Sequence, residues 1–342
     1  MKKLFKVGFI LLFFVSACTS TAMIKEPVDI ALNTMHNAIF ESSEGIEVLY
    51  GDTVGLNRYH SKENTLSLQN KAMDLQADAS AFTLNNDTWY YLTKDVGMNG
   101  GVLNTYLYAA SLDGKKETLV SAIDSVVIPK EGSIALGSEK VLVHKTKAYI
   151  VQFYTLYMYD FKDKTFTKWD LKNVEKICID KDNLYVLVDV YDDVPWVLLQ
   201  CDLDGNIQET LVEKAYVSFV DDNFIFYKKV GEENQKELYI LNRNTKEEKV
   251  MKDTLNNYGV LKQDGKYVFE TYDYWEGKRR IHWMDQNGKI LASKEHDEKL
   301  MLQLLSDSKI YVSSYAFNDT WKFGYYEIKE DEIKDLVVLE ER

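Results

Sequence analysis

The sequence is poor in the residues that usually mark disulfide frameworks, metal sites and chain breaks. It has only 3 cysteines, 3 prolines and 5 histidines among its 342 residues. So few cysteines exclude a dense disulfide framework, and no CxxC pair suggests a zinc or redox site. The histidines are scattered, with no two at the spacing of metal ligands, so we expect neither a metal nor a cofactor.

Catalytic signatures are missing as well. The chain has no GxSxG, HExxH or SxxK motif and no glycine-rich phosphate loop. The segment "DKDNLY" from Asp180 begins like a calcium loop, but it has Leu184 at the fifth position and no glycine at the sixth. We therefore predict no catalytic residues from motifs, and we expect a binding protein more than an enzyme.

Positive charge is in short supply, since the formal net charge is -13 at pH 7. The phosphates of a nucleic acid would be repelled by such a chain, so nucleic acid is not an expected partner. The same excess of acids argues against a domain that charge alone holds on anionic lipid.

The longest apolar run lies at the N-terminus. Lysines at positions 2, 3 and 6 precede an uncharged run over residues 7–15, and the small residues Ser16 and Ala17 follow it. This order is typical of a secretory signal peptide. The run is far shorter than the roughly 20 residues that a membrane-spanning helix needs.

The four residues "VSAC", which end at Cys18, resemble the lipobox of bacterial lipoproteins, although Val15 stands where leucine is usual. The resemblance implies a signal peptide over residues 1–17, a diacylglyceryl group on Cys18, and a tether over residues 18–36. A thiolate is a suitable nucleophile for that acylation, and two acyl chains make a stable anchor. The expected location is outside the cytoplasm, anchored to the bacterial cell membrane. The alternative is an ordinary secreted protein in which Cys18 is accidental.

Aromatic strand segments separated by polar turns are abundant, with 23 Tyr, 15 Phe and 6 Trp. Two turn signals each occur seven times, mostly about 40 to 45 residues apart, which is the mark of a repeat fold. The first set of turns is centred on Asn64, Gly114, Asp163, Gly205, Thr245, Gly288 and Asp331. The second set is centred on Glu44, Asp87, Thr146, Asp182, Asp222, Asp264 and Ser308.

Each unit therefore consists of four antiparallel strands, which is the description of a β-propeller blade. We predict an all-β chain with seven four-stranded blades over residues 37–342. The seventh blade is complete in itself, so the ring should close by packing of blades 1 and 7. The longer step from Asp87 to Thr146 predicts an extra hairpin or loop. A β-sandwich or a β-solenoid is the alternative, but sandwiches do not repeat and solenoid repeats are usually shorter.

The units resemble the propellers of uncharacterised bacterial lipoproteins, with TolB-like propellers as looser relatives. The resemblance covers about residues 37–342 and rests on turns, which are structural. The Gly-His and Trp-Asp pairs of WD40 blades are absent.

Cys178 and Cys201 should lie on the first and third strands of blade 4. One strand then separates them, so their Cα atoms should be about 10 Å apart. A disulfide tolerates no more than about 7 Å. We expect two buried thiols.

The loops that join the second and third strands of a blade are the candidate binding face. In blades 4, 6 and 7 they pair acids with aromatic rings, which suits sugars, cations or peptides. The candidate residues are Tyr191, Asp192, Asp193, Trp196, Asp273, Tyr274, Trp275, Asp319 and Trp321. The alternative is that the rings pack between blades and the acids only solubilise hairpins.

Two classes of function follow. The first is a non-catalytic binding or scaffold protein whose propeller rim binds a protein, peptide or glycan. The second is a glycan-active hydrolase or lyase with acids at the channel mouth. The innermost strands, which include "VLVH" and "ICID", are mostly apolar, so we expect few site residues there.

Overall fold

The computed structural model shows a body built of β-strands. It describes residues 38–50, 55–60, 65–72, 79–96, 102–127, 139–189, 196–230, 237–251, 254–273, 276–296, 300–314 and 322–341. All of them belong to the second of the two units into which the chain divides, Met35–Arg342. Cys18 lies outside the described residues, so its lipidation stays a prediction. No helix long and apolar enough to cross a membrane occurs among the residues described.

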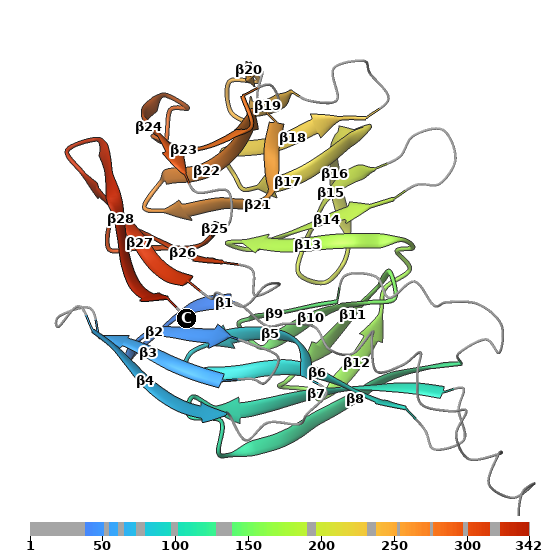
Figure 1. The fold of residues 1–342 in the computed structure, drawn as a ribbon. Coiled ribbons are helices and arrows are strands. Elements are labelled where there is room, and N and C mark those ends of the chain that lie inside the picture. The colour runs from blue at the N-terminus through green and yellow to red at the C-terminus, as the bar shows by residue number, and fades with distance from the viewer. Residues whose placement is uncertain are drawn as a thin grey trace, which may run out of the picture. The chain divides into compact units, whose positions relative to one another are not determined.

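The strands form seven antiparallel sheets, each made of four consecutive strands in sequence order (Figure 1). Blade 1 holds β1 (Ala38–Ser42), β2 (Gly45–Tyr50), β3 (Gly55–His60) and β4 (Thr65–Ala72). Blade 2 holds β5 (Ala79–Asn85), β6 (Thr88–Val96), β7 (Val102–Ser111) and β8 (Glu117–Val127). Blade 3 holds β9 (Lys140–His144), β10 (Lys147–Gln152), β11 (Thr155–Asp160) and β12 (Thr165–Lys168).

The second half of the body repeats the same plan. Blade 4 holds β13 (Val174–Asp180), β14 (Asn183–Val188), β15 (Val197–Cys201) and β16 (Ile207–Glu213). Blade 5 holds β17 (Ala215–Val220), β18 (Phe224–Lys229), β19 (Leu238–Asn242) and β20 (Glu248–Met251). Blade 6 holds β21 (Thr254–Gln263), β22 (Lys266–Asp273), β23 (Lys278–Met284) and β24 (Ile290–His296). Blade 7 holds β25 (Leu300–Ser306), β26 (Lys309–Ser314), β27 (Lys322–Lys329) and β28 (Glu332–Glu341).

The seven sheets form a ring in which each blade contacts the next. The innermost strand of a blade is its first, as in the contacts of β5 with β9 and of β21 with β25. Strands β1 and β25 meet, and so do β4 and β28, which joins blade 7 to blade 1. Among the described strands, no sheet borrows a strand from another. The predicted seven-bladed β-propeller is confirmed, and the described part of blade 7 packs on blade 1 without strand exchange, as predicted.

Aromatic side chains fill the junction between blades 7 and 1. Tyr59 of β3 packs against Tyr311, Phe323 and Tyr325 of blade 7, with ring centroids 5.8 to 6.3 Å apart. Tyr59, Tyr311 and Phe323 are almost fully buried. We call these four residues the closing junction. Burial of such rings is the main force that can hold two sheets together where no strand is shared.

The turns lie at the positions predicted from the sequence, but more residue types form them than expected. All fourteen turn markers except Asn64, which lies outside the described residues, fall in turns or bends. Several two-residue hairpins have positive φ at both positions, the type I′ geometry. They include Asn86–Asp87, at 47° and 59°, and Asp307–Ser308, at 48° and 59°. Asparagine and aspartate tolerate the left-handed region, so a glycine is not required.

Gly205 is a position that does require glycine. Its φ is +100°, and a Cβ atom there would lie 2.8 Å from the Trp169 ring. The indole of blade 3 thus packs directly beneath a hairpin of blade 4.

Two further expectations concern the insertion and the cysteines. The surplus between Asp87 and Thr146 is partly taken up by the long hairpin of β7 and β8, and residues 128–138 lie outside the described residues. Cys178 and Cys201 lie on β13 and β15, with β14 between them, and both are free. Cys201 is buried, as expected, whereas Cys178 is only partly buried.

Candidate functional site

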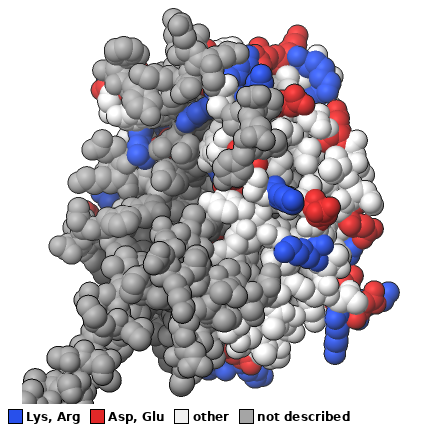
Figure 2. All heavy atoms as spheres, turned by 90° about the vertical axis from the view of Figure 1, so that its right-hand side faces the viewer, with Lys and Arg blue, Asp and Glu red and all other residues white. Residues whose placement is uncertain are grey.

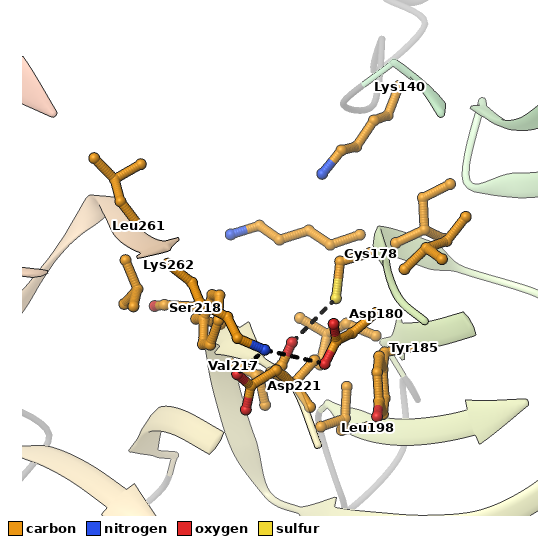
Figure 3. A pocket seen from close by; sticks show the side chains of 17 residues that line it. Lys140, Cys178, Asp180, Tyr185, Leu198, Val217, Ser218, Asp221, Leu261 and Lys262 are labelled. Atoms are coloured by element: carbon orange, nitrogen blue, oxygen red, sulfur yellow. Dashed lines mark hydrogen bonds and ion pairs between the residues drawn. The ribbon is translucent and has the colours of Figure 1, made fainter. Parts of the chain in front are cut away.

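A cavity of about 440 Å³ opens among the innermost strands of blades 3 to 6, a volume suited to a small ligand (Figure 3). Its apolar lining is Ile177, Ile179, Leu187, Leu198, Val217, Phe219, Val220, Val260 and Leu261. Its polar lining is Lys140, Lys176, Cys178, Asp180, Tyr185, Ser218, Asp221 and Lys262.

Strand periodicity explains how β13 supplies three polar groups to this cavity. Lys176, Cys178 and Asp180 are two residues apart, and in a β-strand alternate side chains share a face. Cys178 pairs with Tyr185 of β14, and both pack against the side chains of blade 5. Ile177 points the other way and packs in the cluster shared with blade 3. An apolar strand can therefore present a polar face to the cavity without exposing its core.

Lys262 bridges two carboxylates from neighbouring blades. Its Nζ lies 2.7 Å from Asp221 and 3.3 Å from Asp180 (Figure 3). Burial opposes the charged ammonium, but the hydrogen bond and ion pair with Asp221, helped by Asp180, raise the pKa of Lys262. Blades 4, 5 and 6 are thus tied together by one ammonium group.

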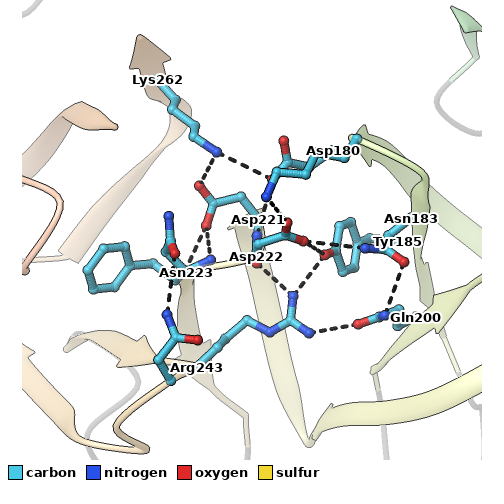
Figure 4. A network of polar contacts seen from close by, with 12 residues as sticks. Asp180, Asn183, Tyr185, Gln200, Asp221, Asp222, Asn223, Arg243 and Lys262 are labelled. Atoms are coloured by element: carbon cyan, nitrogen blue, oxygen red, sulfur yellow. Dashed lines mark hydrogen bonds and ion pairs between the residues drawn. The ribbon is translucent and has the colours of Figure 1, made fainter. Parts of the chain in front are cut away.

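Asp221 is the centre of a wider polar network (Figure 4). Its side chain is 2% exposed and accepts hydrogen bonds from the backbone N–H groups of Asn223 and Phe224 at 2.8 and 2.7 Å. The Tyr267 hydroxyl donates to its Oδ2 at 2.7 Å. With every oxygen engaged, Asp221 holds the cavity floor in place and is poorly suited to accept a substrate proton.

Arg243 extends this network from blade 5 into blade 4 (Figure 4). Its Nη1 donates to the Tyr185 hydroxyl at 2.8 Å and to the Asp221 carbonyl oxygen at 2.7 Å, while Nη2 donates to Gln200 at 2.7 Å. Burial is the main cause of the raised pKa of Tyr185. The guanidinium fixes the wall of the cavity that Tyr185 forms.

The other end of the cavity is cationic. Lys140 begins β9, and Lys176 lies near the start of β13, where its Nζ donates to the Tyr216 hydroxyl. Desolvation, followed by the positive charge of Lys176 and opposed by Cys178, lowers the pKa of Lys140, although its side chain still meets solvent. Desolvation and the charge of Lys176 also lower the pKa of Lys228 on β18. Lys176 therefore repels one ammonium group from each of the two neighbouring blades. We call Lys140 and Lys176 the cavity lysines.

Cys178 lies between the cationic end and the aspartates, and it is an unreactive thiol. Burial raises its pKa to about 12, although the nearby Lys140 acts in the opposite direction. Its Sγ donates to the Val220 carbonyl oxygen at 3.6 Å. At neutral pH it adds no negative charge to the cavity.

Most of the predicted rim residues lie outside the described residues. These are Tyr191, Asp192, Asp193, Tyr274, Trp275, Asp319 and Trp321. Trp196 and Asp273 are described, and each is engaged locally. The Trp196 ring is partly buried and meets the Tyr216 ring edge-on at 4.7 Å. Asp273 accepts the Glu276 N–H at 3.1 Å and lies 3.6 Å from Arg280 Nη1.

The end of β14 and the cationic end of the cavity are on the same side of blade 4. Val174, at the start of β13, pairs with Val188, at the end of β14. Trp196 contacts Tyr216, which in turn binds Lys176. One predicted residue is therefore a single side chain away from the cavity.

The innermost strands supply several polar side chains to the cavity, which were not singled out from the sequence. Segments such as "VLVH" and "ICID" are apolar, but Lys140 stands directly before the first and Lys176 directly before the second. A lysine at the start of an apolar inner strand is the signal that would have found them. The sequence does not show that strands about 40 residues apart direct these lysines into one space.

The outer surface differs from the cationic end of the cavity in its distribution of charge. On the face in Figure 2, the visible described Lys and Arg side chains are interspersed with Asp and Glu. Among the described residues, no group of three or more His, Cys, Asp or Glu side chains is placed to hold a metal ion.

Comparison with known proteins supports the fold. No protein-family model matches the chain, and no curated protein matches its sequence significantly. Its structure is similar to the β-propeller domain of the trilobed protease from Pyrococcus furiosus, which has an open velcro topology. The TM-score is 0.53 at 14% identity, over 90% of this chain and 97% of that domain.

The chain is also similar to the acylaminoacyl peptidase of Pyrococcus horikoshii. The TM-score is 0.52 at 12% identity, over 89% of this chain. This chain spans only 52% of the peptidase. Identities this low show a shared fold and nothing about activity.

Proposed function

We propose that this chain is a lipid-anchored binding protein of the bacterial cell surface, with a propeller that binds a ligand and does no chemistry. The cavity among the innermost strands of blades 3 to 6 carries this proposal. It combines about 440 Å³ of space with mostly apolar walls and a few converging polar groups, the usual make-up of a ligand site. The aromatic and acidic rim loops would form its mouth and contact a larger protein, peptide or glycan partner.

The anchor is tested by membrane fractionation. Cys18→Ser removes the acceptor of the lipid, so the variant should leave the membrane fraction and appear in the soluble fraction. Ser16→Thr is a matched control that leaves Cys18 in place and should stay with the membrane. A serine variant that stays with the membrane would show that Cys18 is not the anchor.

The binding role is tested by filling the cavity. Ser218 lines it, and its Oγ has no hydrogen-bond partner among the described residues. Ser218→Phe should place a ring in the space. Small molecules that raise the melting temperature of the wild-type chain should then have no effect on the variant. Hits that stabilise both proteins equally bind elsewhere and would refute the proposal.

A hydrolase or lyase is the second candidate, because Asp180 and Asp221 both face the cavity and share one ammonium. Glycosidases place two carboxylates about 5 to 10 Å apart. Here Lys262 stands between the two acids, and the hydrogen bonds of Asp221 are already satisfied, which favours binding. Asp180→Asn separates the candidates: it would abolish a glycosidase, whereas a binding protein would keep its ligand.

A further inference from the structure

We infer that the cavity binds the anionic group of a small amphiphilic ligand, a carboxylate or a phosphate, between Lys140 and Lys176. This inference rests on the proposed function and names the class of ligand. The expected ligand has two parts: an anionic head group that binds at the cationic end and an apolar body that packs against the cavity wall.

The two kinds of lysine in the cavity differ in their partners. Lys262 has carboxylates at 2.7 and 3.3 Å. In the described part of the chain, Lys140 makes no hydrogen bond or ion pair, and Lys176 meets only the hydroxyl and the ring of the neutral Tyr216. Lys262 therefore needs no ligand, whereas neither cavity lysine forms an ion pair with a carboxylate within the described residues.

Placing the cavity lysines close together is electrostatically unfavourable, and the propeller fold does not require lysines at these positions. Each shift in the pKa of Lys140 and Lys228 records repulsion from Lys176 together with loss of water. The chain as a whole has 54 acids against 41 Lys and Arg. An acidic chain that gathers lysines from three blades without acidic partners has the arrangement of an anion site.

The neighbouring acid Glu175 attracts Lys176 but forms no ion pair with it within the described residues. Glu175 and Asp189 lie on the same side of blade 4, but burial and then their mutual repulsion raise the pKa of Glu175, opposed by Lys176. The Cys178 thiol is uncharged at neutral pH. An anion entering here would meet two ammonium groups.

The apolar wall of the cavity indicates that the rest of the ligand is apolar. Leu187, Leu198, Val217 and Val220 offer aliphatic surface, and the volume accommodates a chain of several carbons. A free inorganic anion would leave this surface unused.

The test compares hexanoate, hexyl phosphate and hexanol by titration calorimetry on the full chain carrying Cys18→Ser. We expect one or both anions to bind at least tenfold more tightly than hexanol, and the stronger of the two identifies the head group. Lys140→Met and Lys176→Met should each remove most of that preference. Lys116→Met, a matched change at an exposed hairpin lysine, should leave it intact.

The controls separate the two proposals. If hexanol binds as well as the anions and Ser218→Phe abolishes all binding, the cavity binds ligands but the anion inference is wrong. If binding survives Ser218→Phe, or if no probe binds, both proposals are overturned. If the lysine variants keep the tenfold preference, the anion is held elsewhere and the inference fails.

Discussion

The closing junction of blades 7 and 1 and the cavity of blades 3 to 6 belong to the same ring of blades, but they are filled differently. At the closing junction Tyr59, Tyr311 and Phe323 interlock and leave almost no exposed surface. At the cavity, lysines and aspartates replace large rings, and about 440 Å³ remains open. Aromatic rings fill the junction between blades 7 and 1, whereas charged side chains at the cavity line a space that solvent or a ligand can occupy.

The difference shows how a repeat fold can divide stability from binding. Each blade has the same four strands, so any junction between blades has the same backbone frame. Side chains alone decide whether a junction is packed or hollow. The comparison can be tested by changing each region in turn.

The largest expected effect is at the closing junction. Phe323→Ala removes a ring that is fully buried between blades 7 and 1. Truncation of a buried Phe costs about 3 to 5 kcal/mol in the free energy of unfolding. Denaturant unfolding should show this loss. Tyr59→Phe, which keeps the ring, should cost much less, and equal losses would mean that the hydroxyl group, not packing, holds the junction.

The next effect is a dependence of stability on pH that the closing junction should not show. His282 of blade 6 is stacked on Phe269 at 5.0 Å, and desolvation lowers its pKa from 6.5 to about 4. Since the unfolded chain takes up this proton first, stability should fall as the pH falls from about 6.5 to 4, by about 3 kcal/mol in all.

The tyrosines of the closing junction do not titrate in that range, because burial raises the pKa of both Tyr59 and Tyr311 from 10.0. His282→Gln should flatten this part of the stability–pH curve, whereas Tyr59→Phe should leave its slope unchanged. A curve that keeps its full slope in the glutamine variant would assign the effect to another group.

A smaller effect is expected at the cavity floor. Lys262→Met leaves Asp180 and Asp221 without their shared cation. Breaking a buried pair costs about 3 to 5 kcal/mol, and partial exposure of Lys262 and Asp180 reduces this to about 2 kcal/mol. Adding Asp180→Asn should recover part of the loss in denaturant unfolding. A further loss in the double variant would show that Asp180 has a partner more important than Lys262.

The smallest effect on stability is expected at Cys178, where the prediction concerns the reactivity of the thiol. With a pKa of about 12, its thiol should react with iodoacetamide at pH 8 about a thousandfold more slowly than in the unfolded chain. Lys140→Met removes the charge that favours the thiolate, so the rate should fall further. Mass spectrometry of the labelled Cys178 peptide measures both rates. A faster reaction in the methionine variant would show that access, not charge, limits the thiol.

Much of the fold could be predicted from the sequence because the signals for turns and strands are local. Turn residues recur at regular intervals, and alternating aromatic and aliphatic residues between them specify strands. Blade number, closure without strand exchange and the free state of Cys178 and Cys201 all followed from that spacing. The type I′ hairpin at Phe153–Tyr154, at 47° and 58°, shows the limit, since no turn residue marks it.

The residues that line the cavity were not predicted from the sequence, and Trp196 and Lys176 show the reason. Trp196 was chosen as an exposed loop aromatic, but it is partly buried against Tyr216, because a loop end can fold back onto the next blade. Lys176 was passed over because its strand is apolar. A strand shows its pattern in sequence, but which face meets a cavity depends on how neighbouring blades are rotated against each other.

Local sequence signals specify the repeat, the strand order within each blade and the length that closes seven blades into a ring, since all of these depend on contacts close in the chain. Which junction is packed and which is hollow depends on how the blades pack in three dimensions. Lys140, Lys176 and Lys262 come from three different blades, and their convergence depends on the curvature of the whole ring. That curvature is the sum of packing at every junction, so no single segment encodes it.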